Sequence, residues 1–288
     1  MKIGFIGIGV MGEAMATHLL EAGHDLFVFN RTKSKADRIV GLGATWCNDV
    51  KTVAQSAEVI FTIIGVPADV ENVYLAEDGL IAQANKETIL VDMTTSTPQL
   101  AKRIYEAGSE KGIHCLDAPV TGGDVGAKNG TLTIMVGGEE SVYKKIFPLL
   151  ELMGKTIAYM GEAGNGQHTK MTNQIGIAGA IIGMAEALSY AKNANLDLEN
   201  TLKIITSGSA GSWQLSNLAP RVIKEDFDPG FYIKHFIKDM RIATKEAGDM
   251  DLDLPGLNLV LSLYEEQESK DSDFGNLGTQ ALYKLYEK

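Results

Sequence analysis

Along residues 1–162, short apolar runs alternate with longer segments in which hydrophobic residues recur every three or four positions. Apolar runs without an alternating polar position indicate strands that are buried on both faces, as in a parallel sheet. The periodic segments between them indicate helices that pack on this sheet. The predicted strands lie at residues 2–6, 25–29, 44–46, 58–64, 88–93 and 114–117, and residues 131–137 and 156–160 are expected to finish the same sheet. The pattern predicts an α/β fold with a doubly wound, Rossmann-type sheet.

The segment at residues 163–195 differs, because no proline interrupts it and it is almost wholly apolar from residue 175 to 184. As one helix of about 28 residues it would span roughly 42 Å. Beyond it the alternation stops and only helical periodicity remains, at residues 198–207, 212–218, 234–247 and 257–267. We therefore expect a first domain at residues 1–162, a linking helix at 163–195 and an all-α C-terminal domain at 196–288.

The first apolar run leads into a glycine-rich turn and then into a helical segment. The turn has the pattern G-x-G-x-x-G and consists of Gly7, Ile8, Gly9, Val10, Met11 and Gly12. In this pattern the first glycine permits a tight turn, the second lets the backbone approach a pyrophosphate, and the third lets the helix pack closely on the strand. Because the pattern lies between a strand and a helix, it predicts dinucleotide binding at the helix N-terminus. The alternative is a glycine turn with no functional consequence.

The end of the second strand carries information about the type of dinucleotide. A site that prefers NAD usually has Asp or Glu here, which accepts a hydrogen bond from the ribose 2′-hydroxyl. This chain has Asn30, Arg31 and Thr32 instead. A carboxylate would repel a 2′-phosphate, whereas an amide, a guanidinium and a hydroxyl can bind it. We therefore expect NADP, with NAD less favoured; the alternative is that Arg31 only faces solvent.

Two further loops follow predicted strands at the carboxyl edge of the sheet, where the cofactor is expected. Val66 and Pro67 follow the strand at 58–64, and Thr95 follows the strand at 88–93. Ser96 or Thr97 can cap a helix that begins at Pro98. For Thr95, helix capping and contact with a nicotinamide remain equally open.

Later in the chain, two sets of residues indicate substrate chemistry. The backbone N–H groups of Thr121, Gly122 and Gly123 can form a concave site for a small carboxylate, although a plain glycine turn is the alternative. Lys170, Asn173 and Gln174 have the i, i+3, i+4 spacing that places side chains on one face of a helix. An ammonium beside two amides can hold and protonate an oxygen; the alternative is that Lys170 is solvated.

Composition narrows the classes of function. The 288-residue chain has 45% hydrophobic and 22% charged residues, which is typical of a globular protein with enough length for two domains. A net charge of −11 argues against nucleic acid as a partner. The two cysteines, Cys47 and Cys115, show neither a disulfide framework nor metal spacing. With no basic N-terminal region and a central apolar run short of the ~20 residues of a membrane span, we expect a cytoplasmic protein without a membrane partner.

These motifs together resemble the β-hydroxyacid dehydrogenases, the family that includes 3-hydroxyisobutyrate dehydrogenase and tartronate semialdehyde reductase. The resemblance runs from end to end. It depends on the opening glycine turn, on residues 117–123, on residues 164–166 followed by Lys170 and Asn173, and more weakly on Lys238 and Asp239.

The resemblance implies a fold and roles for individual residues. It implies a Rossmann domain, a long linking helix and a helical C-terminal domain that helps to build a homodimer or homotetramer. Lys170 would be the catalytic lysine, assisted by Asn173 or Gln174, and the loop of Thr121, Gly122 and Gly123 would hold the substrate carboxylate. Thr95 and Lys238 would contact the cofactor near its nicotinamide, and Phe231 and Asp239 would line the cleft.

The expected reaction is the NADP-dependent interconversion of a small 3-hydroxy acid and its semialdehyde or oxo acid, with Lys170 as general acid/base. Two departures leave the substrate open: Thr121 stands where the family commonly has Ser, and Gln174 where many members have a second Asn. The presence of Lys170 counts against the imine reductases, which share the architecture. Other possibilities are a non-catalytic dinucleotide sensor and a decarboxylase similar to 6-phosphogluconate dehydrogenase.

Overall fold

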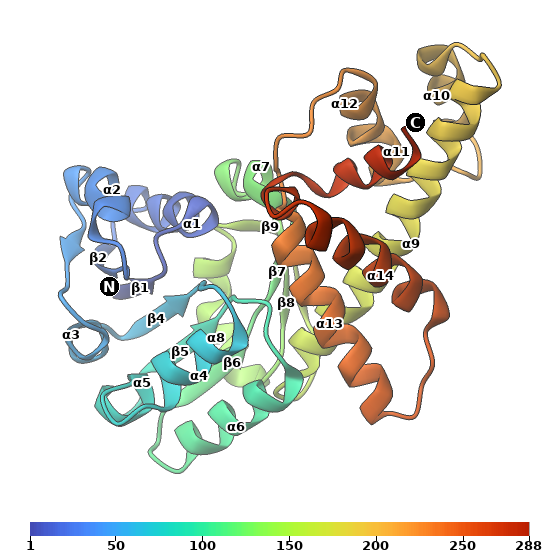
Figure 1. Cartoon of the computed structure of the whole chain (residues 1–288). Helices are drawn as coiled ribbons and strands as arrows, with labels where there is room; N and C mark the ends of the chain where they lie inside the picture. Colours follow the sequence, from blue (N-terminus) through green and yellow to red (C-terminus); the bar gives the residue numbers. More distant parts are fainter. Residues whose placement is uncertain (288) are drawn as a thin grey trace. The chain divides into compact units, whose positions relative to one another are not determined.

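Six parallel strands form the larger sheet of the protein, for which the computed structural model describes residues 1–287. The strands are β1 (Lys2–Ile6), β2 (Asp25–Phe29), β3 (Thr45–Trp46), β4 (Val59–Thr62), β5 (Ile89–Asp92) and β6 (His114–Asp117). They lie in the order β3-β2-β1-β4-β5-β6, and every neighbouring pair is parallel (Figure 1). The order reverses between β1 and β4, and in sheets of this kind dinucleotides bind at the carboxyl ends of the strands beside that reversal. The predicted Rossmann-type sheet is confirmed.

Helices pack on both faces of this sheet. Ile3 and Phe5 of β1 belong to a core that includes α1 (Val10–Glu21), α2 (Asp37–Gly41) and α8 (Glu140–Leu150). Ile60 of β4 and Leu90 of β5 belong to a second core, formed with α3 (Val50–Ser56), α4 (Pro67–Leu75), α5 (Leu80–Gln83) and α6 (Pro98–Ser109). Because successive side chains of a strand point to opposite faces, both cores require apolar residues, and this explains the continuous apolar runs.

The last strands of the first half form a separate sheet, so the expectation that residues 131–137 and 156–160 finish the large sheet was wrong. β7 (Val120–Thr121) is antiparallel to β8 (Leu132–Val136), and β8 is parallel to β9 (Gly154–Tyr159). An isolated bridge between Asp117 and Gly137 lies where the two sheets meet. After β6 the chain passes through Pro119, which has no N–H group to continue a strand ladder, and pairing begins again with β8.

A single continuous helix of 29 residues, α9 (Asn165–Asn193), follows β9. Its length is about 44 Å at ~1.5 Å per residue, as the sequence indicated. The protein consists of two compact units, Met1–Lys170 and Met171–Lys288, whose boundary falls within this helix. By length and composition α9 also meets the minimum for a membrane-crossing helix, a criterion that core helices of soluble proteins satisfy too.

The second unit contains the larger part of α9 and then continues with helices. They are α10 (Leu198–Thr206), α11 (Trp213–Asn217), α12 (Ala219–Ile223), α13 (Ile233–Asp249), α14 (Pro255–Lys270) and the 3-10 segments η2 (Phe274–Asn276) and η3 (Thr279–Tyr286). The side chain of Asp197 caps α10 by accepting from the backbone N–H of Asn200. Phe236 and Tyr264 bring α13 and α14 together, with ring centroids 5.6 Å apart. The helical C-terminal domain is confirmed, although α12 and the 3-10 segments were too short to be detected by periodicity.

Candidate active site

The three glycines of the opening turn meet different spatial requirements. Gly7 has φ +101°, and a Cβ there would lie 2.1 Å from the carbonyl oxygen of Ile63. At Gly12 a Cβ would lie 1.9 Å from the carbonyl oxygen of Gly7. At Gly9, the N-cap of α1, a Cβ would meet nothing within 4 Å. The turn itself therefore requires Gly7 and Gly12, whereas Gly9 leaves the open space that close approach of a pyrophosphate needs.

Asn30 is tied to the glycine turn by both ends of its amide. Its Oδ1 accepts from the backbone N–H of Ile8 at 3.0 Å, and its Nδ2 donates to the carbonyl oxygen of Thr32 at 2.8 Å. The backbone N–H of Gly7 donates to Phe29 at 3.0 Å. Asn30 therefore holds the end of β2 against the turn, a positioning role that the sequence did not reveal. Direct contact between Asn30 and the cofactor stays a prediction.

Arg31 lies at the same edge, with a side chain that is 89% exposed. Its Nη1 is 3.6 Å from Oδ1 of Asp69, which lies in the first turn of α4. Val66 caps α4 and Pro67 is its first residue, so the structure brings Arg31 and the Val66–Pro67 loop to one place. Sequence reasoning missed Asp69. It brings a carboxylate to Arg31 at the end of β2, where the chain itself has no Asp or Glu.

The loop that carries Thr95 is held by Gln167, a fully buried residue in the first turn of α9. The Oε1 of Gln167 accepts from the backbone N–H of Ser96 at 2.9 Å. Its Nε2 donates to the carbonyl oxygen of Thr94 at 2.7 Å. These two bonds lie on either side of Thr95 and fix the loop relative to the start of α9. Helix capping belongs to Thr97, whose hydroxyl accepts from Leu100 at the start of α6.

Asp117, at the end of β6, anchors the start of α9. Its Oδ1 accepts from the backbone N–H of Gly164 at 2.8 Å, and its Oδ2 accepts from that of Gln167 at 2.9 Å. Burial raises the pKa of Asp117, and these two hydrogen bonds partly offset that shift. Asp117 and Gln167 thus join the ends of β5 and β6 to the helix that carries Lys170. Sequence reasoning assigned no role to Gln167, because a buried glutamine has no local signature.

The predicted carboxylate loop contains two glycines with positive φ, +130° at Gly122 and +64° at Gly123. Thr121 is the last residue of β7, and Gly122 is the N-cap of a short helix, α7 (Gly123–Lys128), where a loop was expected. His18 of α1 holds α7 through its Nε2, 2.9 Å from the carbonyl oxygen of Ala127. The backbone here requires glycine, while its role in substrate binding stays a prediction.

Lys170 is only 5% exposed, so the reading of a solvated first-turn lysine does not hold. It lies on α9 one turn after Gln167 and one turn before Asn173 and Gln174. In the second unit, Asn173 donates to Gln174 at 2.8 Å and Gln174 donates to Asp239 at 2.7 Å.

Lys238 and Phe231 also belong to the second unit. The Nζ of Lys238 is 2.9 Å from Oδ1 of Asp239, its neighbour on α13. Phe231 packs edge-on against Phe236 at 5.9 Å between ring centroids. The structure therefore joins four of the predicted residues, Asn173, Gln174, Lys238 and Asp239, into one polar chain.

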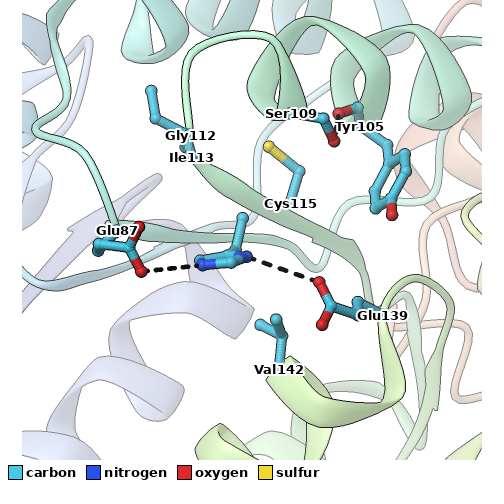
Figure 2. Close-up of a pocket in the computed structure, with 9 residues that line it drawn as sticks. Glu87, Tyr105, Ser109, Gly112, Ile113, Cys115, Glu139 and Val142 are labelled. Atoms are coloured by element: carbon cyan, nitrogen blue, oxygen red, sulfur yellow. Dashed lines mark hydrogen bonds and ion pairs between the residues drawn. The ribbon is translucent and has the colours of Figure 1, made fainter.

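A separate cavity of about 210 Å³ lies at the amino ends of β5 and β6 (Figure 2). There the imidazole of His114 lies between Glu87 and Glu139, at 3.4 Å and 3.8 Å. Cys115, on the wall of the cavity, is buried, and burial raises its pKa to about 12. Because dinucleotides bind at the carboxyl ends of such strands, this cavity is not the cofactor site. It contains none of the predicted site residues.

Comparison with known proteins covers nearly the whole chain. Residues 2–161 match the family model of the NAD-binding domain of 6-phosphogluconate dehydrogenase, and residues 164–286 match that of the NAD-binding region of NADP-dependent 3-hydroxyisobutyrate dehydrogenase. An uncharacterised oxidoreductase of Bacillus subtilis is 54% identical over 99% of both chains. The 2-hydroxy-3-oxopropionate reductase of Escherichia coli is 39% identical over 88% of this chain and 87% of its own. The NAD-dependent L-serine dehydrogenase of Pseudomonas aeruginosa is 37% identical over 91% of each.

Two solved structures share the fold closely. The 3-hydroxyisobutyrate dehydrogenase of Mycobacterium tuberculosis, solved with L-serine, superposes with a TM-score of 0.91 at 27% identity, over 100% of this chain and 99% of that one. Psf3, solved in complex with NADP⁺ and 2-OPP, has a TM-score of 0.90 at 26% identity, over 98% and 99%.

Proposed function

Since the chain belongs to the β-hydroxyacid dehydrogenase family of NAD(P)-binding oxidoreductases, we propose that it interconverts a small 3-hydroxy acid and its semialdehyde or oxo acid. The observation that carries this proposal is the burial of Lys170 on α9, directly after the turn that Asp117 and Gln167 anchor. Burying an ammonium is costly, and the groups around it must be arranged to offset that cost. A dinucleotide sensor without chemistry would not need it.

In this proposal Lys170 is the general acid/base. It donates a proton to the developing alkoxide during reduction and accepts that proton during oxidation. Reduction requires the lysine to arrive charged, which is the ordinary state of lysine at neutral pH. Bound cofactor would supply the hydride chemistry.

The substrate class follows from the compounds that the relatives' names contain. 2-Hydroxy-3-oxopropionate, 3-hydroxyisobutyrate and L-serine all have a carboxylate at C1 and an oxygen at C3. The distance between these groups is fixed by one intervening carbon. In this protein Lys170 would serve the C3 oxygen, and the backbone of Thr121, Gly122 and Gly123 would hold the carboxylate.

NADP is the preferred cofactor in this proposal. The exposed guanidinium of Arg31 at the end of β2 supports it, as does the NADP⁺ complex of Psf3. Asp69, 3.6 Å from Arg31, and the NAD-dependent relative weigh on the other side. Parallel assays with NADPH and NADH decide the preference, and a clear preference for NADH would overturn it.

The test of the reaction is a substrate panel of small 3-hydroxy acids and semialdehydes, with wild type and Lys170→Ala. We expect the variant to bind cofactor normally and to lose roughly 10²–10⁴-fold in kcat, the range for a positioned acid/base. Cofactor binding, measured by fluorescence titration, is the control for folding. Near-normal turnover in Lys170→Ala would remove the proposed role, and no turnover by wild type on any acid would favour the sensor.

A further inference from the structure

Four polar side chains of the second unit form a chain of contacts that ends on Asn173. The Nζ of Lys238 lies 2.9 Å from Oδ1 of Asp239. The Nε2 of Gln174 donates to Oδ2 of Asp239 at 2.7 Å, and the Nδ2 of Asn173 donates to Oε1 of Gln174 at 2.8 Å. Gln174 is fully buried and Asp239 is 2% exposed. Water therefore cannot substitute for these partners.

The charge at one end of this chain dictates the orientation of every amide along it. A carboxylate beside an ammonium can only accept hydrogen bonds. Gln174 must therefore turn its NH₂ group toward Asp239, which leaves its oxygen facing Asn173. Asn173 must in turn direct its own NH₂ group at that oxygen. Its carboxamide oxygen then points away from Gln174 and is presented to other donors.

From this geometry we infer that Gln174 and Asp239 are positioning residues, which fix Asn173 so that it presents a hydrogen-bond acceptor one helical turn from Lys170. The inference rests on the proposed function, in which Lys170 is the general acid/base. An acceptor suits the hydroxyl of a 3-hydroxy acid or an ammonium, whereas an amide NH₂ at this place would suit a carbonyl or carboxylate. Asn173 is thus the working amide, and Gln174, engaged at both ends of its amide, serves to orient it.

Reversing one amide of the chain would require reversing the next. A flipped Gln174 would place its oxygen against the carboxylate of Asp239 and its NH₂ against the NH₂ of Asn173. Facing acceptors and facing donors are both strongly disfavoured where no solvent can intervene. The Oδ1 of Asp239 lies 2.9 Å from the ammonium of Lys238, which compensates the buried negative charge. The charges of Lys238 and Asp239, more than the number of hydrogen bonds, therefore set the polarity of the chain, that is, the direction in which its amides donate.

A double-mutant cycle tests this polarity without changing Asn173 or Lys170. Gln174→Glu brings two buried carboxylates together and should lower kcat about 10–10²-fold, the cost of a displaced catalytic group. Asp239→Asn leaves Gln174 free to adopt either orientation and should also lower kcat. In Gln174→Glu/Asp239→Asn the new amide can donate to the new carboxylate, which still accepts from Asn173. This double variant keeps the wild-type net charge. Its kcat should be about tenfold or more above the value expected if the fold-losses of the two single variants multiplied.

Melting temperatures of the same variants separate a positioning role from a structural one. Gln280→Glu is the matched control, because Gln280 is a buried glutamine of the same unit that donates to the carbonyls of Asp226 and Asp228. It should lower the melting temperature and leave kcat unchanged. If the double variant recovers stability and not kcat, the chain of contacts is purely structural and the inference is wrong. A wild type inactive on every acid would overturn the proposed function as well, whereas an active wild type with an unrescued double variant overturns this inference alone.

Discussion

Replacing Asp117 by alanine tests whether the start of α9 is held by a buried carboxylate. The substitution removes the acceptor of two buried backbone N–H groups, those of Gly164 and Gln167. A buried donor left without a partner costs about 1–3 kcal/mol, so the two together should cost about 2–6 kcal/mol. For a protein of this size that corresponds to a melting temperature lower by roughly 3–10 °C.

Asp117→Asn should be milder than Asp117→Ala for two reasons. Asparagine keeps one oxygen acceptor, although its NH₂ group then faces a backbone N–H. It also carries no charge, and burial disfavours the charge of Asp117, as the raised pKa of this residue indicates. We expect about half of the loss seen for alanine.

The assay combines thermal unfolding with kcat, and Asp197→Ala is the matched control. Asp197 caps α10 through the same kind of bond, to the backbone N–H of Asn200 at 2.6 Å, and it is exposed. Its loss should cost about 1 kcal/mol and leave kcat unchanged. Asp117→Ala should in addition lower kcat about 10–10²-fold, because Lys170 follows the anchored turn. If the Asp117→Ala protein melted no lower than the Asp197→Ala protein, the two hydrogen bonds that Asp117 accepts would not stabilise the fold as argued, and the reasoning would be refuted.

Three further predictions concern pH, the glycine turn and the cofactor. Burial raises the pKa of Asp92 from its ordinary value to about 6, so the folded state binds an extra proton between about pH 4 and 6 and loses stability as the pH rises through that window. Asp92→Asn keeps the single oxygen that accepts from Thr62 and Thr94. In urea unfolding at several pH values, the free energy of unfolding of this variant should depend less steeply on pH than that of wild type, and an unchanged dependence would contradict the raised pKa. Gly12→Ala should unfold the first unit or prevent its expression, because its Cβ would meet the Gly7 carbonyl, whereas Gly9→Ala should melt normally and lose affinity for the cofactor in a titration. Arg31→Ala should raise the KM for NADPH and leave that for NADH nearly unchanged; equal effects on both cofactors would exclude a 2′-phosphate contact.

The positions of most elements followed from the sequence because hydrophobic periodicity is a local signal. Strands covered on both faces gave continuous apolar runs, and α9 appeared as an uninterrupted apolar helix. Strand partners are not local, and so β8 and β9 were assigned to the wrong sheet. The helix α7 was missed because its six residues include two glycines, Gly123 and Gly126, and do not complete two turns.

In the candidate site, too, features set by a local motif were predictable, whereas contacts between residues distant in sequence were not. The glycine turn was predictable because its three positions are set by a motif of six residues. The role of Asn30 was not, since the N–H group that it accepts from belongs to Ile8, 22 residues earlier. The partners of Asp117 lie 47 and 50 residues away, and sequence cannot reveal that Gln167 is buried. Polar residues whose partners are distant in sequence look like ordinary surface residues until the fold is known.

Lys170 lies on α9 one turn from each of two fully buried glutamines, Gln167 and Gln174. A carboxylate fixes each of them, Asp117 through the backbone N–H of Gln167 and Asp239 through the side chain of Gln174. A buried amide cannot change orientation without breaking its bonds, so the helical face that carries Lys170 has little conformational freedom. Enzymes that depend on such preorganisation lose transition-state stabilisation when the supporting residues change, and they lose it in kcat more than in KM. Substitutions at Gln167 and Gln174 should therefore resemble a weakened Lys170, with the ground-state affinity for substrate largely kept. Substitutions at Thr121, which we propose to hold the carboxylate, should instead change mainly KM.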